Sequence, residues 1–206
     1  MLLNQLARKK LFTTNIYTTK VLEKYIENLK KRKNVKVLNL GYVCGKNIEF
    51  LSNQGFTVYV EDYLGSLTPQ KIKSSSKGKK IEYIYEFKNF SYPPNFFDGT
   101  ICWDLFDYLD FEYGMKFINE IERITKEKGF LFCLFDTKKP EIKSLTRKKI
   151  IIHDINHLLY EEVKFNRIFY TFYENRDIYK LLKNFKILET FYVKNGVREI
   201  LAQKII

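Results

Sequence analysis

The chain has 206 residues, 45% of them hydrophobic, which is enough to bury one α/β core without disulfides or a structural metal. Its 36 basic and 24 acidic residues give a formal net charge of +12, but the lysines are spread along the chain, so the charge alone does not indicate a nucleic-acid partner, and we expect a small-molecule substrate. No apolar run is long enough to span a membrane, so we expect no membrane insertion. The three cysteines lack the paired spacings of disulfide, zinc or redox sites, so we expect a cytoplasmic protein that binds no metal.

The first predicted element is an amphipathic helix over Tyr17–Arg32. Its apolar side chains recur at helical spacing, so one face should pack on a sheet; they are Val21, Leu22, Tyr25, Ile26 and Leu29. We expect one domain over residues 1–206, in which residues 1–32 form a helical cap beside the ligand cleft.

A strand, a tight glycine turn and a helix come next. Val35–Leu40 is apolar enough for a buried parallel strand, Gly41 permits a sharp exit from it, and Asn47–Asn53 has the pattern of a helix. Gly45 lets a ligand approach the free N–H groups where that helix starts. A turn of this kind also needs glycine for steric reasons alone, so the two glycines leave ligand binding open.

The second strand, Thr57–Val60, ends at an acidic pair that contains Asp62. In doubly wound α/β folds a carboxylate about 20 residues after the glycine turn accepts hydrogen bonds from ribose hydroxyls, and Asp62 stands at about that distance from Gly41. The lysine-rich stretch Lys71–Lys80 is then either a solvated loop or a contact for phosphate or an anionic partner.

The remaining pattern completes an α/β sheet. Short connections and helix crossovers predict that the first five strands are parallel, and the Asn195–Gly196 turn predicts an antiparallel last pair. The later strands are Ile81–Tyr85, Thr100–Trp103, Phe130–Phe135, Lys186–Val193 and Arg198–Gln203, with helices at Tyr113–Glu127 and Arg176–Leu182.

The segment from residue 140 to residue 172 is too long for a plain crossover. Its β-branched and aromatic runs predict a small β-rich insertion over the carboxyl ends of the strands, on the active-site side. The aromatic residues in and next to it either line an acceptor pocket or simply cover the sheet; they are Tyr160, Phe169, Tyr170, Phe172 and Tyr173.

In order and spacing, four of these segments resemble the class I S-adenosylmethionine-dependent methyltransferases, in particular the small type 11-like domains. The resemblance rests on the glycine turn, the acidic strand end and two later blocks, Phe97–Leu109 and Ile118–Phe135. It covers residues 33 to 135 and extends more loosely to the last hairpin. It implies a three-layer Rossmann-like sheet of about seven strands, mostly parallel with an antiparallel C-terminal hairpin, and S-adenosylmethionine as the cofactor.

The resemblance also implies the residues around the cofactor, which are Asn39, Gly41, Tyr42, Gly45, Asp62, Glu86 and Trp103. Asp62 matches the ribose acid, and Glu86 stands near the position of an acid beside the adenine amine. The first glycine motif is degenerate at two positions. Asn39 stands where the family usually has an acid, and Val43 puts a β-branched side chain where a central glycine lies beside the methionine part of the cofactor.

Three residues are candidates for catalysis. Asp104 and Asp107 follow the fourth strand, where the resemblance places residues that face the transferred methyl group; either can serve as a base, and Asp107 fits a helix cap equally well. His153 and His157 would share a face on a helix, which makes His153 a candidate base, but no third ligand for a metal stands near them.

Two functions from different classes stay open. The first is S-adenosylmethionine-dependent methyl transfer to an unidentified small-molecule acceptor, by direct displacement between aligned reactants. The second is a catalytically inactive methyltransferase-fold module for binding or scaffolding, which the departures at Asn39 and Val43 favour. The motifs of two base-methylating chemistries are missing, because Asp104 is not followed by Pro-Pro and Cys102 is not followed by proline. The oligomeric state is not predicted.

Overall fold

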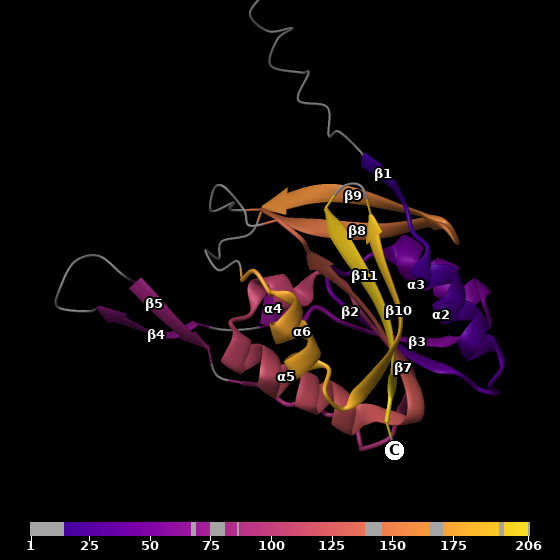
Figure 1. Ribbon diagram of the computed structural model, residues 1–206, viewed down its shortest axis with the longest axis horizontal. Helices are drawn as coiled ribbons and strands as arrows, with labels where there is room; N and C mark the ends of the chain where they lie inside the picture. The colour runs from indigo at the N-terminus through magenta and orange to yellow at the C-terminus, as the bar shows by residue number, and fades with distance from the viewer. Residues whose placement is uncertain are drawn as a thin grey trace, which may run out of the picture.

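The computed structural model describes residues 15–66, 69–74, 81–85, 87–138, 146–164, 171–193 and 196–205. Figure 1 shows a central sheet with helices on both sides, a smaller sheet above it, and a two-stranded sheet that reaches out to one side. Among the described residues no helix is long and apolar enough to cross a membrane.

Six strands of the described chain form the central sheet. Their bounds are β2 Lys36–Leu40, β3 Thr57–Glu61, β6 Phe97–Cys102, β7 Thr125–Asp136, β10 Phe185–Val193 and β11 Val197–Lys204. In the order β10-β11-β7-β6-β2-β3, the strands β7, β6, β2 and β3 run parallel, and β11 is antiparallel to both β7 and β10. This sheet confirms the predicted Rossmann-like α/β class with its antiparallel C-terminal hairpin.

Helices cover both faces of the central sheet. On one face lie α2 (Val21–Lys30) and α3 (Gly45–Asn53), and on the other lie α5 (Phe111–Ile124) and α6 (Asn175–Leu181) (Figure 1). Side chains alternate along a strand, so Val37 joins the core beneath α2 while its neighbour Leu38 joins the core beneath α5. Two short helices start at strand ends: α4 (Tyr63–Ser66) follows β3, and the 3₁₀ helix η1 (Leu105–Tyr108) follows β6.

The strand predicted at Ile81–Tyr85, β5, forms but does not join the central sheet. It pairs antiparallel with β4 (Pro69–Ser74), and the two make a separate sheet. The expectation of five parallel strands is therefore wrong for this strand. β5 finds its partner in β4, most of which lies in the lysine-rich stretch that the sequence analysis left as a loop or an anion contact.

The predicted N-terminal helix starts later than expected. Asn15–Thr18 is a strand, β1, and the helix α2 begins at Val21. The start is fixed from far along the chain, because a carboxylate oxygen of Glu199 accepts hydrogen bonds from the backbone N–H groups of Lys20 (2.9 Å) and Val21 (3.1 Å). Glu199 is buried in β11, so this remote carboxylate satisfies two donors at the helix start.

Residues 146–164 form a hairpin of β8 (Thr146–Asp154) and β9 (His157–Lys164), and β1 extends it to a three-stranded sheet. A fully buried side chain of α3 ties this hairpin to the core. Asn47 donates from Nδ2 to the carbonyl of Ile150 (2.8 Å) and accepts at Oδ1 from the N–H of Ile152 (2.7 Å). The middle of β8 is therefore fixed to the helix that follows the glycine turn.

Candidate functional site

The glycine turn has the tight geometry that its sequence predicts. Gly41 has a φ of 144°, and its N–H donates to the carbonyl of Glu61 at 3.0 Å, which joins the ends of β2 and β3. A Cβ at Gly41 would lie 2.9 Å from Cδ1 of Trp103, so conformation and packing both require glycine there. A Cβ at Gly45, by contrast, would meet nothing within 4 Å. The protein's own packing therefore gives no reason for glycine at the start of α3.

Asn39 and Trp103 meet beneath this turn. The indole Nε1 of Trp103 donates to Oδ1 of Asn39 at 2.8 Å, and both side chains are buried. Within the described part of the chain, Nδ2 of Asn39 is a buried donor without a partner. The structure thus brings three of the predicted cofactor residues together, but two of them support the turn from below and expose no side chain to a ligand.

Asp62 lies just past the end of β3, beside the glycine turn, and an arginine already binds it. Nη1 and Nη2 of Arg147 donate to the two carboxylate oxygens at 2.9 and 2.7 Å, and the backbone N–H of Gly65 donates to Oδ1 at 3.0 Å. The guanidinium also lies over the ring of Tyr42, with its Cζ 4.7 Å from the centroid. Arg147 is 6% exposed. Two predicted cofactor residues, Tyr42 and Asp62, are thus held by the same arginine.

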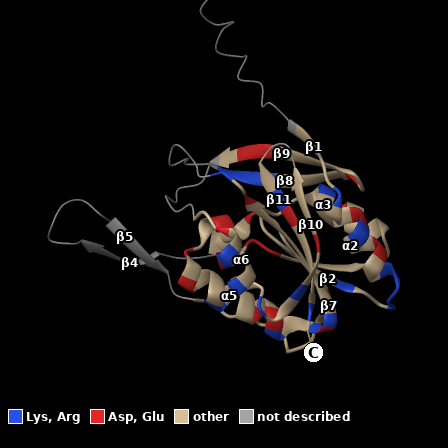
Figure 2. Ribbon diagram, in the orientation of Figure 1, with Lys and Arg blue, Asp and Glu red and all other residues tan. Residues whose placement is uncertain are grey.

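Arg147 comes from the start of β8, where three basic residues follow one another. Figure 2 shows this blue end of β8 beside red residues of β9, and Lys149 pairs with Glu161 of that strand at 3.0 Å. Sequence reasoning missed Arg147. In a chain this rich in Lys and Arg nothing marks one member of a basic run as the partner of a carboxylate 85 residues away.

A second polar cluster lies where β6 and β7 end. Asp104 accepts from the hydroxyl of Tyr108 at 3.2 Å, and Asp107 accepts at Oδ2 from the backbone N–H of Asp136 at 3.0 Å. Lys148, next to Arg147 on β8, binds both carboxylate oxygens of Asp136 at 2.6 and 2.8 Å. Two of the predicted catalytic candidates, Asp104 and Asp107, are therefore neighbours in one cluster of carboxylates at the carboxyl edge of the sheet.

Burial in this cluster raises the pKa of both candidate carboxyls, Asp104 and Asp107. Burial raises the pKa of Asp104 to about 6, against the opposing effect of Lys148. Burial and the nearby Asp136 and Asp104 raise the pKa of Asp107 well above its ordinary value. Oδ1 of Asp107 is buried and has no hydrogen-bond partner in the described residues. Asp104, with a pKa near neutrality, is the better suited of the two for accepting a proton.

The histidines lie on strands, so they do not share the face that a helix would have given them. His153 ends up on β8 and His157 on β9, on either side of the hairpin turn. The ring Nδ1 of His157 lies 2.9 Å from a carboxylate oxygen of Asp154, and both side chains are more than 40% exposed. His153 is exposed. The β-branched Ile150–Ile152 run pairs with β9 and draws this segment into a sheet.

The remaining sequence predictions concern Glu86, the aromatic residues of the insertion and Val43. Glu86 lies outside the described residues, as do Phe169 and Tyr170. Tyr160 and Tyr173 are buried in the two cores, which supports the reading that they cover the sheet. Val43 is 51% exposed in the turn, so its side chain projects out of the core.

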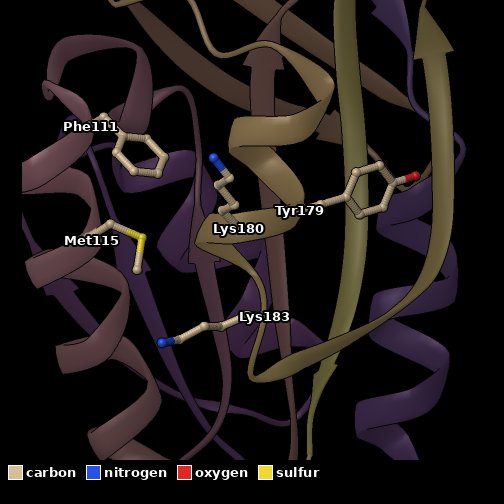
Figure 3. A pocket seen from close by; sticks show the side chains of 5 residues that line it. All are labelled: Phe111, Met115, Tyr179, Lys180 and Lys183. Carbon is tan, nitrogen blue, oxygen red and sulfur yellow. The ribbon is translucent and has the colours of Figure 1, made fainter.

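The structure also has a groove of about 500 Å³ between α5 and α6. Figure 3 shows Phe111 and Met115 on α5, the ammonium groups of Lys180 and Lys183 reaching toward that helix, and Tyr179 pointing away from it. The residues that line the groove include none of the predicted cofactor or catalytic residues. It is therefore separate from the site at the strand ends.

Comparison with known proteins identifies the fold. No protein family and no curated protein matches the sequence. Among solved structures, a SAM-dependent methyltransferase of Methanosarcina mazei has a TM-score of 0.54 at 16% identity, covering 88% of this chain and 97% of its own. A 1,6-didemethyltoxoflavin-N1-methyltransferase of Burkholderia thailandensis, with bound 1,6-didemethyltoxoflavin and S-adenosylhomocysteine, has a TM-score of 0.53 at 13% identity, covering 90% and 78%. The [4+2]-cyclase SpnF has a TM-score of 0.51 at 11% identity, covering 100% and 92%.

The chain therefore has the fold of the class I SAM-dependent methyltransferases, as the resemblance predicted. At these identities the similarity concerns the fold, which hosts more than one chemistry.

Proposed function

We propose that the protein binds S-adenosylmethionine and transfers its methyl group to a small-molecule acceptor. The observation that carries this proposal is the position of Asp62. Its carboxylate lies beside the turn between β2 and α3, because Gly41 hydrogen-bonds to Glu61 immediately before it. A carboxylate beside a glycine turn, at the carboxyl edge of a parallel sheet, is the arrangement that recognises a ribose.

The residues at this edge suit the nucleoside end of the cofactor. Asp62 would accept hydrogen bonds from the ribose hydroxyls, and the open space at Gly45 would let the ligand approach the first N–H groups of α3. Tyr42, 37% exposed beside them, offers an aromatic face. Val43 would lie toward the methionine end. When bound, the cofactor supplies a methyl group on a sulfonium, which is a good leaving group, so the protein needs no nucleophile of its own.

Proton transfer would fall to Asp104. An acceptor that loses a proton on methylation needs a base near it, and the pKa of about 6 leaves Asp104 mostly ionised at pH 7.5 and able to take that proton. Tyr108, which donates to the Asp104 carboxylate, orients it.

Calorimetric titration with S-adenosylhomocysteine tests cofactor binding without knowledge of the acceptor. We expect saturable binding that Asp62→Ala removes and Glu112→Ala leaves unchanged, because Glu112 is an exposed carboxylate on α5. No heat of binding at millimolar ligand would contradict the proposal. Incubation with methyl-labelled S-adenosylmethionine and a cell extract then identifies the acceptor class, since label would enter the small-molecule fraction rather than protein or RNA.

The second candidate function is a catalytically inactive module with this fold. A specific observation favours it, namely the arginine that occupies Asp62. The labelled-methyl experiment separates the two functions, because the inactive module would transfer no label to any acceptor.

We also propose a cytoplasmic location. Cys44, Cys102 and Cys133 are free and buried, which fits a compartment that keeps thiols reduced.

A further inference from the structure

The strongest unassigned feature of the molecule is the contact between β8 and the predicted cofactor residues. Arg147 takes both oxygens of Asp62 in a bidentate pair and covers the ring of Tyr42. Neither contact holds the core together: Tyr42 is exposed, and Asp62 lies in the turn before α4. The arginine therefore binds the surface that the ligand would use.

We infer that Arg147 competes with the cofactor for Asp62, an inference that rests on the proposed function. The guanidinium must leave the carboxylate before the nucleoside can bind. A ribose diol and a guanidinium each present a pair of donors that can meet the two oxygens of one carboxylate. Oδ1 of Asp62 already accepts from Gly65 as well as from Arg147. The carboxylate thus cannot keep the arginine and accept two hydroxyls in the same geometry.

The competitor is fixed in place by its own strand. Asn47 binds the backbone of β8 at Ile150 and Ile152, three and five residues past Arg147, and both isoleucines are buried. The backbone of β8 therefore stays near the glycine turn, and Arg147 is presented to Asp62 at a high effective concentration. Displacing the guanidinium requires the side chain, or the short stretch before Ile150, to move away.

The adjacent residue makes the same kind of contact at the other half of the site. Lys148 binds the carboxylate of Asp136 where β7 ends, next to Asp104 and Asp107. Two consecutive cations of one strand thus meet carboxylates at the ends of β3 and β7, which are separated in the sheet by β2 and β6. The ligand can bind only those molecules in which Arg147 has left Asp62. Its apparent dissociation constant therefore rises in inverse proportion to the fraction of such molecules.

The test is calorimetric titration of the full chain with S-adenosylhomocysteine, comparing the native protein with Arg147→Met. We expect the variant to bind about 10- to 100-fold more tightly, the size of effect that a charge-assisted contact gives. Lys149→Met is the matched control, because Lys149 lies on the same strand, 5.8 Å from the same Tyr42 ring, but pairs with Glu161 and does not touch Asp62. It should leave the affinity unchanged. Circular dichroism shows whether each variant is folded.

The outcomes separate the inference from the proposed function. Equal or weaker binding by a folded Arg147→Met chain overturns the inference and leaves cofactor binding standing. Arg147→Lys is a second check on the same point, since it keeps the charge but not the bidentate fork, and an affinity between those of the native chain and the methionine variant supports competition. If neither the native chain nor any variant binds the ligand at millimolar concentration, the proposed function fails and the inference fails with it.

Discussion

Breaking the Asp62–Arg147 ion pair should destabilise the fold by an amount that depends on which partner is removed. Arg147 is 6% exposed and Asp62 is 28% exposed, so the arginine depends more on its partner. Removing one partner of a buried ion pair costs about 3–5 kcal/mol, whereas an exposed pair contributes about 0–1 kcal/mol. We expect Asp62→Asn to cost about 2–3 kcal/mol, between these limits.

Arg147→Met should cost less, about 1 kcal/mol, because Asp62 keeps the hydrogen bond from Gly65 and reaches water. The double variant should cost about 1.5 kcal/mol, since it leaves neither charge buried without its partner. The three values give a coupling energy of about 2 kcal/mol between the two positions.

Urea unfolding measures these differences, and the single tryptophan, Trp103, is a buried fluorescent probe beside the site. The exposed Glu112–Lys116 pair of α5 is the control and should show a coupling of about 0.3–0.5 kcal/mol. If the effects of Asp62→Asn and Arg147→Met simply add to within about 0.5 kcal/mol, the arginine does not bind Asp62 in solution and the reasoning is refuted.

Three further predictions concern the supports of the site. Asn47→Ala removes both hydrogen bonds that hold β8 and should lower the free energy of unfolding by about 2–4 kcal/mol in urea. Lys46→Ala, at the exposed neighbouring position, should change it by less than about 0.5 kcal/mol. Similar effects of the two variants would mean that the hydrogen bonds of Asn47 do not form. Gly41→Ala combines a φ of 144° with a Cβ 2.9 Å from a ring atom and should cost about 2–3 kcal/mol, while Gly45→Ala, with nothing within 4 Å, should be nearly neutral; the reverse order would contradict the turn geometry. Burial raises the pKa of Asp104 from 3.8 to about 6, so the stability gained from protonating it is present below the unfolded-state pKa of 3.8 and is lost as the pH rises through 6. Asp104→Asn should therefore stabilise the fold by about 1–2 kcal/mol at pH 7.5 and not at pH 3.5; the partial exposure of Asp104 to solvent keeps this gain small. A variant that is less stable than the native chain at pH 7.5 would contradict this prediction.

Local patterns predicted the parts of the fold that depend on neighbours in sequence. The alternation of Val37 and Leu38 between two cores, and the glycine exit at Gly41, follow from strand geometry and from a backbone conformation that only glycine adopts easily. The spacing after the glycine turn pointed to Asp62, and the family resemblance pointed to Asp104. A search for polar residues at strand ends would also have found Asp136, the last residue of β7.

Long-range pairing was beyond such patterns. Which strand a segment pairs with depends on the other strands that the fold brings near it. The sequence analysis placed Ile81–Tyr85 in the central sheet, but in the structure this strand pairs with β4. The helix expected from residue 17 gave way to β1 because β9, distant in sequence, offers a partner there. Arg147 reaches Asp62 across 85 residues, and only the fold brings the two together.

The measurement that tests the central claim most directly is a crystal structure of the protein grown with S-adenosylhomocysteine. We predict the ribose hydroxyls on the carboxylate of Asp62, the ligand beside the Gly41 turn, and the guanidinium of Arg147 moved off that carboxylate. A structure from millimolar ligand in which Arg147 still binds Asp62 and no ligand lies at the strand ends would contradict both cofactor binding and competition.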